Sequence, residues 1–235
     1  MQLLERDTAF EQLQDALNSV LGGDGQLVLV AGEAGLGKTA LVQQFCRSVR
    51  DQAEVMVGAC DPLSTPAPLG PLLDVAPHLG AEFQEQLRQP GPTRHLFGAL
   101  VSKLSTGDGT RVLVFEDVHW ADDATLDLLR FFPRRASATR ALMLATYRDD
   151  ELGPHHPLRI ALGDLASSAN LRRVSLQPLS LSAVAKMASR PTPVPLVEFE
   201  AWSRRRSTTM APELCTDVQA HASGLLHPLL HQRLC

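Results

Sequence analysis

The chain has 235 residues, enough for one α/β domain of good size or for one domain with a small appendage. Hydrophobic residues make up 44% and charged residues 20%, an ordinary composition for a soluble protein. The formal net charge of −4 gives no sign of a protein that coats nucleic acid, and no apolar stretch approaches the roughly 20 residues of a membrane-spanning helix. The four cysteines form no CxxC pair and the amino terminus has no apolar leader, so we expect a reduced, cytoplasmic protein.

The first quarter of the chain alternates helix and strand. Residues 8–21 carry apolar side chains at helical spacing, which predicts an amphipathic helix. A continuous apolar run over 27–31 predicts a strand buried on both faces, and residues 38–49 predict a second helix. Residues 54–58 predict another strand. The proline-rich stretch 61–71 predicts an irregular connection that lies against a ligand.

The alternation continues beyond this connection. The spacing predicts helices over 94–104, 122–132, 156–168 and 179–188, and strands over 112–115, 141–146 and 171–176. Strands that alternate with helices imply βαβ units and therefore an α/β fold with a mostly parallel, five-stranded sheet. Right-handed crossovers place ligand-binding loops at the carboxyl edge of such a sheet.

A glycine-rich segment joins the first predicted strand to its helix. It has the spacing GxxxxGK[ST] and consists of Gly32, Glu33, Ala34, Gly35, Leu36, Gly37, Lys38 and Thr39. Small residues let backbone N–H groups surround a phosphate, and the helix adds its positive amino-terminal end. We expect Lys38 to bind the β- and γ-phosphates and Thr39 to bind Mg²⁺. The sequence therefore predicts ATP or ADP binding with Mg²⁺ on a P-loop NTPase fold, a three-layer sandwich.

Charged residues follow two of the other strands. Glu116 and Asp117 end the third strand, where one carboxylate is expected to hold Mg²⁺ and the other to orient water. Which of the two is the metal partner stays open, and the pair is also compatible with a solvated strand end. Arg148 follows the fourth strand and is predicted to sense the γ-phosphate; the alternative is surface pairing with Asp149 or Asp150.

The sequence resembles a known family in several stretches: Glu5-Arg6-Asp7, the glycine-rich loop, Cys60-Asp61-Pro62-Leu63, Glu116-Asp117-Val118-His119-Trp120-Ala121-Asp122 and Tyr147-Arg148-Asp149-Asp150-Glu151-Leu152. It looks like the AAA-type ATPase module of STAND signal-transducing regulators, in bacteria mostly LuxR-type, MalT-like transcriptional activators. The resemblance implies a switch that ADP holds closed and that ATP opens to an oligomer-prone form. It gives Glu116 and Asp117 the Walker B role, gives Arg148 the sensor role, and places Arg6 near the adenine.

The family pattern stops near residue 189. The family continues into a helical lid with a GGNPF-like motif, and that motif is missing here. We therefore expect a nucleotide-binding domain over 1–189 and an atypical tail over 190–235, interpreted as a truncated or frame-shifted lid. The expected function is an ATP-binding, weakly hydrolysing switch module without direct DNA or membrane binding. The alternatives are a stand-alone P-loop enzyme such as a small-molecule kinase, and a nucleotide-binding remnant without turnover.

Overall fold

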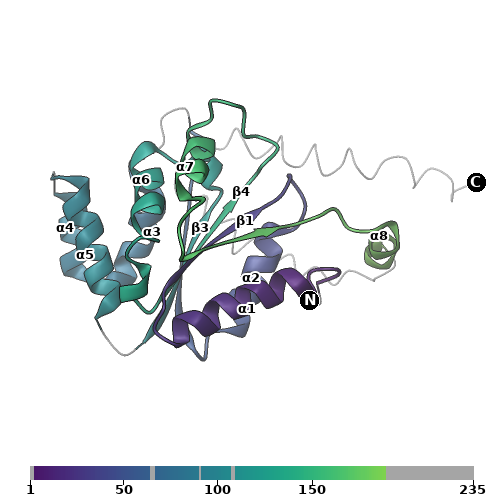
Figure 1. Ribbon diagram of the computed structural model, residues 1–235, viewed down its shortest axis with the longest axis horizontal. Helices are drawn as coiled ribbons and strands as arrows, with labels where there is room; N and C mark the ends of the chain where they lie inside the picture. Colours follow the sequence, from purple (N-terminus) through teal and green to yellow (C-terminus); the bar gives the residue numbers. More distant parts are fainter. Residues whose placement is uncertain (1–2, 64–66, 90, 107–108, 189–235) are drawn as a thin grey trace, which may run out of the picture. The chain divides into compact units, whose positions relative to one another are not determined.

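The computed structural model describes residues 3–63, 67–89, 91–106 and 109–188 (Figure 1). Residues 1–185 form one compact unit and residues 186–235 a second, and the fold described below is that of the first. The predicted tail over 190–235 lies outside the described residues, so its interpretation as an altered lid stays a prediction.

The core of the first unit is a parallel sheet of five strands, which confirms the predicted α/β class. Its strands are β1 (Gln26–Ala31), β2 (Ala53–Ala59), β3 (Thr110–Glu116), β4 (Ala141–Tyr147) and β5 (Leu171–Ser175), in the order β2-β3-β4-β1-β5. Every residue of β1 and β4 is buried, because continuous apolar runs suit strands that are covered on both faces.

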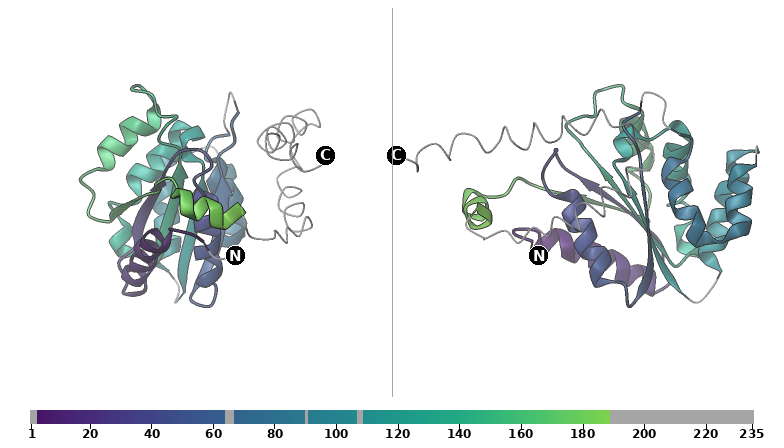
Figure 2. Two further views of the ribbon diagram at one scale, coloured as in Figure 1. Left: turned by 90° about the vertical axis from the view of Figure 1, so that its right-hand side faces the viewer. Right: turned by 180° about the vertical axis from the view of Figure 1, so that it is seen from behind.

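Helices cover both faces of this sheet and give the predicted three layers (Figures 1 and 2). Helices α1 (Asp7–Leu21) and α2 (Lys38–Ser48) lie on one face. On the other face are α3 (Gly70–Leu79), α4 (Ala81–Arg88), α5 (Thr93–Ser105), α6 (Asp123–Phe131) and α7 (Pro157–Leu165). The last described helix, α8 (Leu181–Ala188), follows β5 in the chain. Alternate side chains of β3 enter opposite cores: Val114 packs with α1 and α2, whereas Phe115 packs with α3 to α7. Among the described residues, no helix is long and apolar enough to cross a bilayer.

Two helices were absent from the sequence-based prediction. Residues Gly70–Leu79 and Ala81–Arg88 are the helices α3 and α4, although the prolines around them indicated an irregular connection. Pro71 occupies the first turn of α3, where its missing N–H removes no helical hydrogen bond, and Pro77 lies close to the helix end. Burial of apolar residues at helical spacing, such as Leu72, Val75 and Leu79, stabilises α3 despite its prolines.

The strand order brings three strand ends together at the carboxyl edge of the sheet. Strand β4 lies between β1 and β3, with Ala31 in register with Tyr147 and Phe115 in register with Ala145. The chain leaves β1 through α2 on one face and leaves β4 through α7 on the other. Such a switch point forms a crevice at the carboxyl ends of the strands, where α/β proteins bind ligands.

Candidate functional site

The loop after β1 has a backbone that glycine makes possible. Gly35 and Gly37 have φ angles of 79° and 85°, in the region that L-residues with side chains rarely adopt. A Cβ atom built on either glycine would meet no atom within 4 Å, so the space beside both is open. Helix α2 begins immediately afterwards at Lys38. A glycine-rich loop that leads directly into a helix start is the arrangement that binds phosphate in α/β proteins.

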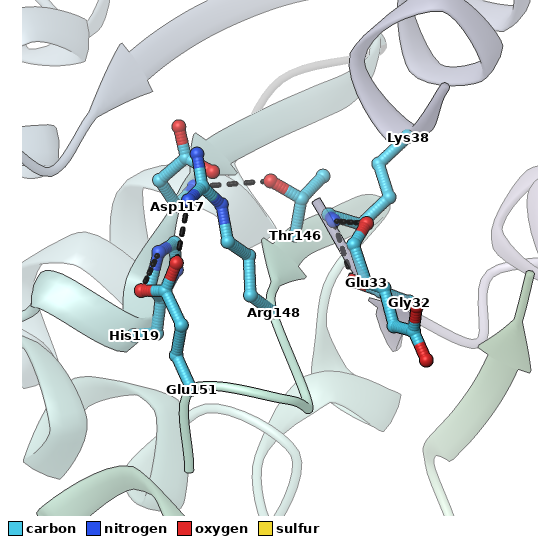
Figure 3. A network of polar contacts seen from close by, with 8 residues as sticks. All are labelled: Gly32, Glu33, Lys38, Asp117, His119, Thr146, Arg148 and Glu151. Atoms are coloured by element: carbon cyan, nitrogen blue, oxygen red, sulfur yellow. Dashed lines mark hydrogen bonds and ion pairs between the residues drawn. The ribbon is translucent and has the colours of Figure 1, made fainter. Parts of the chain in front are cut away.

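Lys38 carries the positive charge of this loop. Its side chain is buried, with 7% of the residue exposed, and its Nζ donates hydrogen bonds to the carbonyl oxygens of Gly32 (2.6 Å) and Glu33 (2.9 Å) (Figure 3). Burial lowers the pKa of Lys38, and the positive charge of Arg148 lowers it further, while Asp117 opposes both effects. An ammonium group in such surroundings gains strongly from a nearby anion.

The two acids at the end of β3 have different surroundings. Glu116 follows the alternation that places Val114 on the α2 face, and burial together with the charge of Glu116 raises the pKa of Cys46 on α2 to about 11. Asp117 leaves the strand with a φ of 56°, and its charge opposes the burial-driven lowering of the pKa of Lys38 and of His119. The acidic pair is therefore divided between two positions.

Thr146 is a site residue that sequence reasoning missed. It is 1% exposed near the end of β4, and its Oγ1 accepts a hydrogen bond of 3.0 Å from the backbone N–H of Asp117 (Figure 3). This bond supports the unusual backbone of Asp117. A hydroxyl residue at the end of an otherwise apolar strand, two residues before Arg148, was the available signal in the sequence.

Arg148 lies in a cluster of side chains beyond β4. Its Nη1 is 2.5 Å from Oε1 of Glu151, and its guanidinium lies 5.2 Å from the centroid of the Trp120 ring. Nε2 of His119 is 3.3 Å from Oε2 of the same Glu151 (Figure 3). The surface alternative predicted pairing with Asp149 or Asp150; Glu151 is the acid in ion-pair contact with Arg148.

His119 and Trp120 belong to a packed turn, a short 3₁₀ helix over Val118–Trp120. The His119 ring lies against the Trp120 ring, with 4.4 Å between centroids. Burial lowers the pKa of His119, and the negative charges of Asp117 and Glu151 oppose that effect. Asp122 then begins α6 as its N-cap, because its side chain accepts hydrogen bonds from the backbone N–H groups of Ala124 and Thr125.

Comparison with known proteins decides the family. Residues 2–145 match the AAA ATPase domain, which is more than half of the chain. The chain belongs to the AAA ATPase domain family. The match covers the phosphate loop and the two acids after β3, and it ends just before Thr146 and Arg148.

Individual relatives are distant. A protein of Rhizobium meliloti (strain 1021) without a described function is 26% identical over 212 residues, which cover 70% of this chain and 21% of the relative. Cdc6p from Pyrobaculum aerophilum superposes with a TM-score of 0.55 at 15% identity, covering 80% of this chain and 49% of Cdc6p. The Orc1 protein of Aeropyrum pernix, solved in complex with DNA, gives 0.55 at 17% identity, covering 88% and 56%. These structures share the fold, and this chain spans about half of their length.

Arg6 links the AAA phosphate loop to the segment after β5. The guanidinium is buried, and it donates to the carbonyl oxygens of Leu36 (3.0 Å), Gln177 (2.9 Å) and Glu5 (2.8 Å). Burial lowers the pKa of Arg6, while the charge of Glu5 opposes this. The Glu5 carboxylate in turn accepts hydrogen bonds from the backbone N–H (2.7 Å) and the hydroxyl of Ser180. Arg6 also borders a cavity of about 200 Å³ between α1 and α2, lined by Leu3, Arg6, Asp7, Phe10, Glu11 and Gln44.

The donor set fits a polyphosphate and its cation. The loop offers open space beside Gly35 and Gly37, and the Lys38 ammonium has a third proton beyond the two it donates to carbonyls. The described residues contain no group of three or more His, Cys, Asp or Glu side chains that could hold a metal alone. A hydroxyl, one or two carboxylates and phosphate oxygens are the set that Mg²⁺ uses in nucleotide sites.

Proposed function

We propose that this AAA ATPase domain binds ATP and ADP with Mg²⁺ and works as a switch that responds to the γ-phosphate, with slow hydrolysis returning it to the ADP state. One observation carries the proposal: the buried Lys38, whose ammonium donates to the carbonyl oxygens of the phosphate loop, lies at the same edge of the sheet as Asp117 and Arg148. The three residues come from the ends of three adjacent strands, β1, β4 and β3. Positive charge for phosphates and an acid for water or metal therefore lie at one edge of the sheet.

Each group in the crevice has a proposed task. Backbone N–H groups around Gly35 and Gly37 and the Lys38 ammonium bind the β- and γ-phosphates. Thr39 and Glu116 hold Mg²⁺, because Glu116 lies on the α2 side of the sheet and Thr39 is in the first turn of α2. When bound, Mg²⁺ neutralises negative charge on the phosphate oxygens. Asp117, held through its backbone by Thr146, accepts a hydrogen bond from the attacking water.

Arg148 is the proposed sensor of the nucleotide state. A third phosphate places additional negative charge near Lys38, and the positive charge of Arg148 is already felt there. A guanidinium binds phosphate oxygens with charge-assisted hydrogen bonds, so Arg148 favours ATP over ADP. The base is proposed to lie towards the cavity beside Arg6, and Arg6 supports the phosphate loop through the Leu36 carbonyl.

The wider role we propose is that of a switch module in a STAND-type, LuxR-like transcriptional regulator. The motifs Glu116–Asp122 and Tyr147–Leu152 support this, since the second contains the sensor arginine together with Glu151, its ion-pair partner. In the Rhizobium meliloti relative, the region similar to this chain is about one fifth of the protein, an arrangement that suits a module controlling other domains. We expect self-association in the ATP state and no direct DNA binding by this chain.

Lys38→Ala tests nucleotide binding. Loss of charge-assisted contacts, each of about 1.5–3 kcal/mol, is expected to weaken both ATP and ADP binding roughly tenfold to 100-fold in calorimetry with Mg²⁺. Lys103→Ala on α5, beside the amino end of β3 and so away from the site, is the matched control and is expected to bind as the wild type does. If neither nucleotide binds to the wild type, the proposal is wrong. Binding without turnover would favour the remnant, and phosphate transfer to a small acceptor would favour a kinase.

A further inference from the structure

The cluster beyond β4 has a connection that nucleotide binding alone does not require. Glu151 contacts two side chains at once: Oε1 pairs with Arg148 and Oε2 lies 3.3 Å from Nε2 of His119. Figure 3 shows the three side chains in contact, with the Glu151 carboxylate between the imidazole and the guanidinium. The carboxylate therefore joins a residue of the turn after β3 to the residue after β4.

His119 is the buried end of this connection. Its side chain is 1% exposed, and within the described part of the chain neither ring nitrogen makes a hydrogen bond. A buried imidazole without partners is costly. The Glu151 carboxylate is the acid close to Nε2, and Trp120 covers the ring. The Glu151 carboxylate therefore lies beside a buried imidazole, and this contact limits where its Oε2 can lie.

Arg148 is the outer end of the connection. Its side chain is 30% exposed and that of Glu151 is 38% exposed, so the pair is in contact with solvent. A long arginine at such a position samples many rotamers unless it is held. Here the ion pair with Glu151 and the face of the Trp120 ring hold it from two sides. In this orientation its charge reaches Lys38.

We propose that Glu151, anchored by His119, is a positioning residue that orients Arg148 towards the phosphate crevice and so sets the preference for ATP over ADP. The inference rests on the proposed function, because it needs Arg148 to act on bound nucleotide. A preoriented guanidinium loses less side-chain entropy when the γ-phosphate arrives, which favours the ATP complex. In this proposal Glu151 acts through Arg148 and does not bind the nucleotide itself.

The central test compares two acids of one loop. Glu151→Ala is expected to lower the ratio of ADP to ATP dissociation constants roughly two- to fivefold, the scale of a solvent-exposed ion pair. Asp150→Asn is the matched control, because the negative charge of Asp150 raises the pKa of Lys38. If the effect came only from removing a negative charge, Asp150→Asn would therefore change the ATP preference more than Glu151→Ala. If Glu151 orients Arg148, Glu151→Ala has the larger effect. A larger change for Asp150→Asn than for Glu151→Ala would overturn the proposal.

Coupling to Arg148 gives the second readout. Glu151→Ala combined with Arg148→Ala is expected to give the same ATP preference as Arg148→Ala alone, because there is then no guanidinium to orient. Glu151→Gln, which keeps an acceptor for Arg148, is expected to restore part of the preference. Additive effects, or no effect of Arg148→Ala on the preference, would refute the inference while leaving nucleotide binding intact. Absence of wild-type binding would instead refute the proposed function.

His119→Phe tests the anchor. Phenylalanine keeps a ring against Trp120 and removes Nε2, so the fold is retained while the contact to Glu151 is lost. We expect a smaller decrease in ATP preference than for Glu151→Ala, and no further decrease when both changes are combined. An effect of His119→Phe that persists undiminished in Glu151→Ala would show that His119 acts by another route and would overturn its role as anchor.

Discussion

The phosphate loop after β1 and the segment after β4 lie at the same edge of the sheet but are held in different ways. In the first, positive φ angles at Gly35 and Gly37 and backbone acceptors fix Lys38, which is 7% exposed. In the second, an ion pair between side chains that are 30% and 38% exposed holds Arg148. Exposed pairs contribute little energy and exchange partners readily. Nucleotide binding thus depends mainly on the backbone of the phosphate loop. The distinction between ATP and ADP depends instead on side chains that can change partner.

Gly37→Val disturbs the backbone of the phosphate loop and has the largest expected effect on nucleotide affinity. A β-branched residue at a φ of 85° costs about 1–2 kcal/mol, and the loop is expected to move to relieve it. Loss of two charge-assisted backbone hydrogen bonds at about 1.5–3 kcal/mol each would weaken ATP and ADP binding roughly 100-fold or more, measured by calorimetry. Gly163→Val on α7, where a Cβ meets no atom within 4 Å, is the control. The essential result is an equal loss of affinity for ATP and for ADP. A loss of ATP affinity alone would contradict the separation of binding by the loop backbone from sensing by Arg148.

The backbone-held region was the part most readily predicted from sequence. The spacing of Gly32 to Thr39 specifies a loop because glycine positions, strand and helix all serve one local structure. The apolar runs of β1, β3 and β4 likewise indicated buried parallel strands. Helix α3 escaped prediction because Pro71 and Pro77 are strong local signals for a break, while the burial that stabilises the helix comes from tertiary packing, mainly against β2 and α4.

The side-chain-held region was predictable in residue type but not in arrangement. Arg148 was identified, yet its partner Glu151 and the anchor His119 lie at the ends of different strands, and tertiary folding brings them together. The separate directions of Glu116 and Asp117 depend on a φ of 56° at Asp117, which no sequence pattern encodes. Thr146 supports that backbone from a neighbouring strand. Such contacts require the register of β3 against β4.

Arg6→Ala tests the support of the phosphate loop from the amino-terminal side, with an intermediate expected effect. The change removes charge-assisted hydrogen bonds to the Leu36 and Gln177 carbonyls from a buried guanidinium. We expect the free energy of unfolding to fall by about 2–3 kcal/mol, measured by urea denaturation, with weaker binding of both nucleotides. Arg159→Ala on α7 removes an exposed arginine that donates to one carbonyl and is expected to change stability by less than about 0.5 kcal/mol.

An outcome for Arg6→Ala with unchanged stability but lost nucleotide affinity would have a different meaning. It would show that Arg6 acts directly on the nucleotide, as its place beside the cavity between α1 and α2 also allows. Loss of stability together with an equal decrease in affinity for ATP and for ADP would instead show that Arg6 supports the backbone of the phosphate loop. The two results thus decide on which side of the comparison Arg6 belongs.

Thr146→Val has the smallest expected effect on stability and joins the two regions. Valine keeps the shape of threonine and removes the acceptor for the Asp117 N–H, at a cost of about 1 kcal/mol. Thr139→Val is the matched control, because Thr139 is also buried and its hydroxyl bonds to the Ala136 carbonyl. We expect similar losses of stability for both variants. A fall in ATP turnover at saturating nucleotide should occur for Thr146→Val alone, since that change releases the backbone that aims Asp117; equal turnover in both variants would separate Asp117 from hydrolysis.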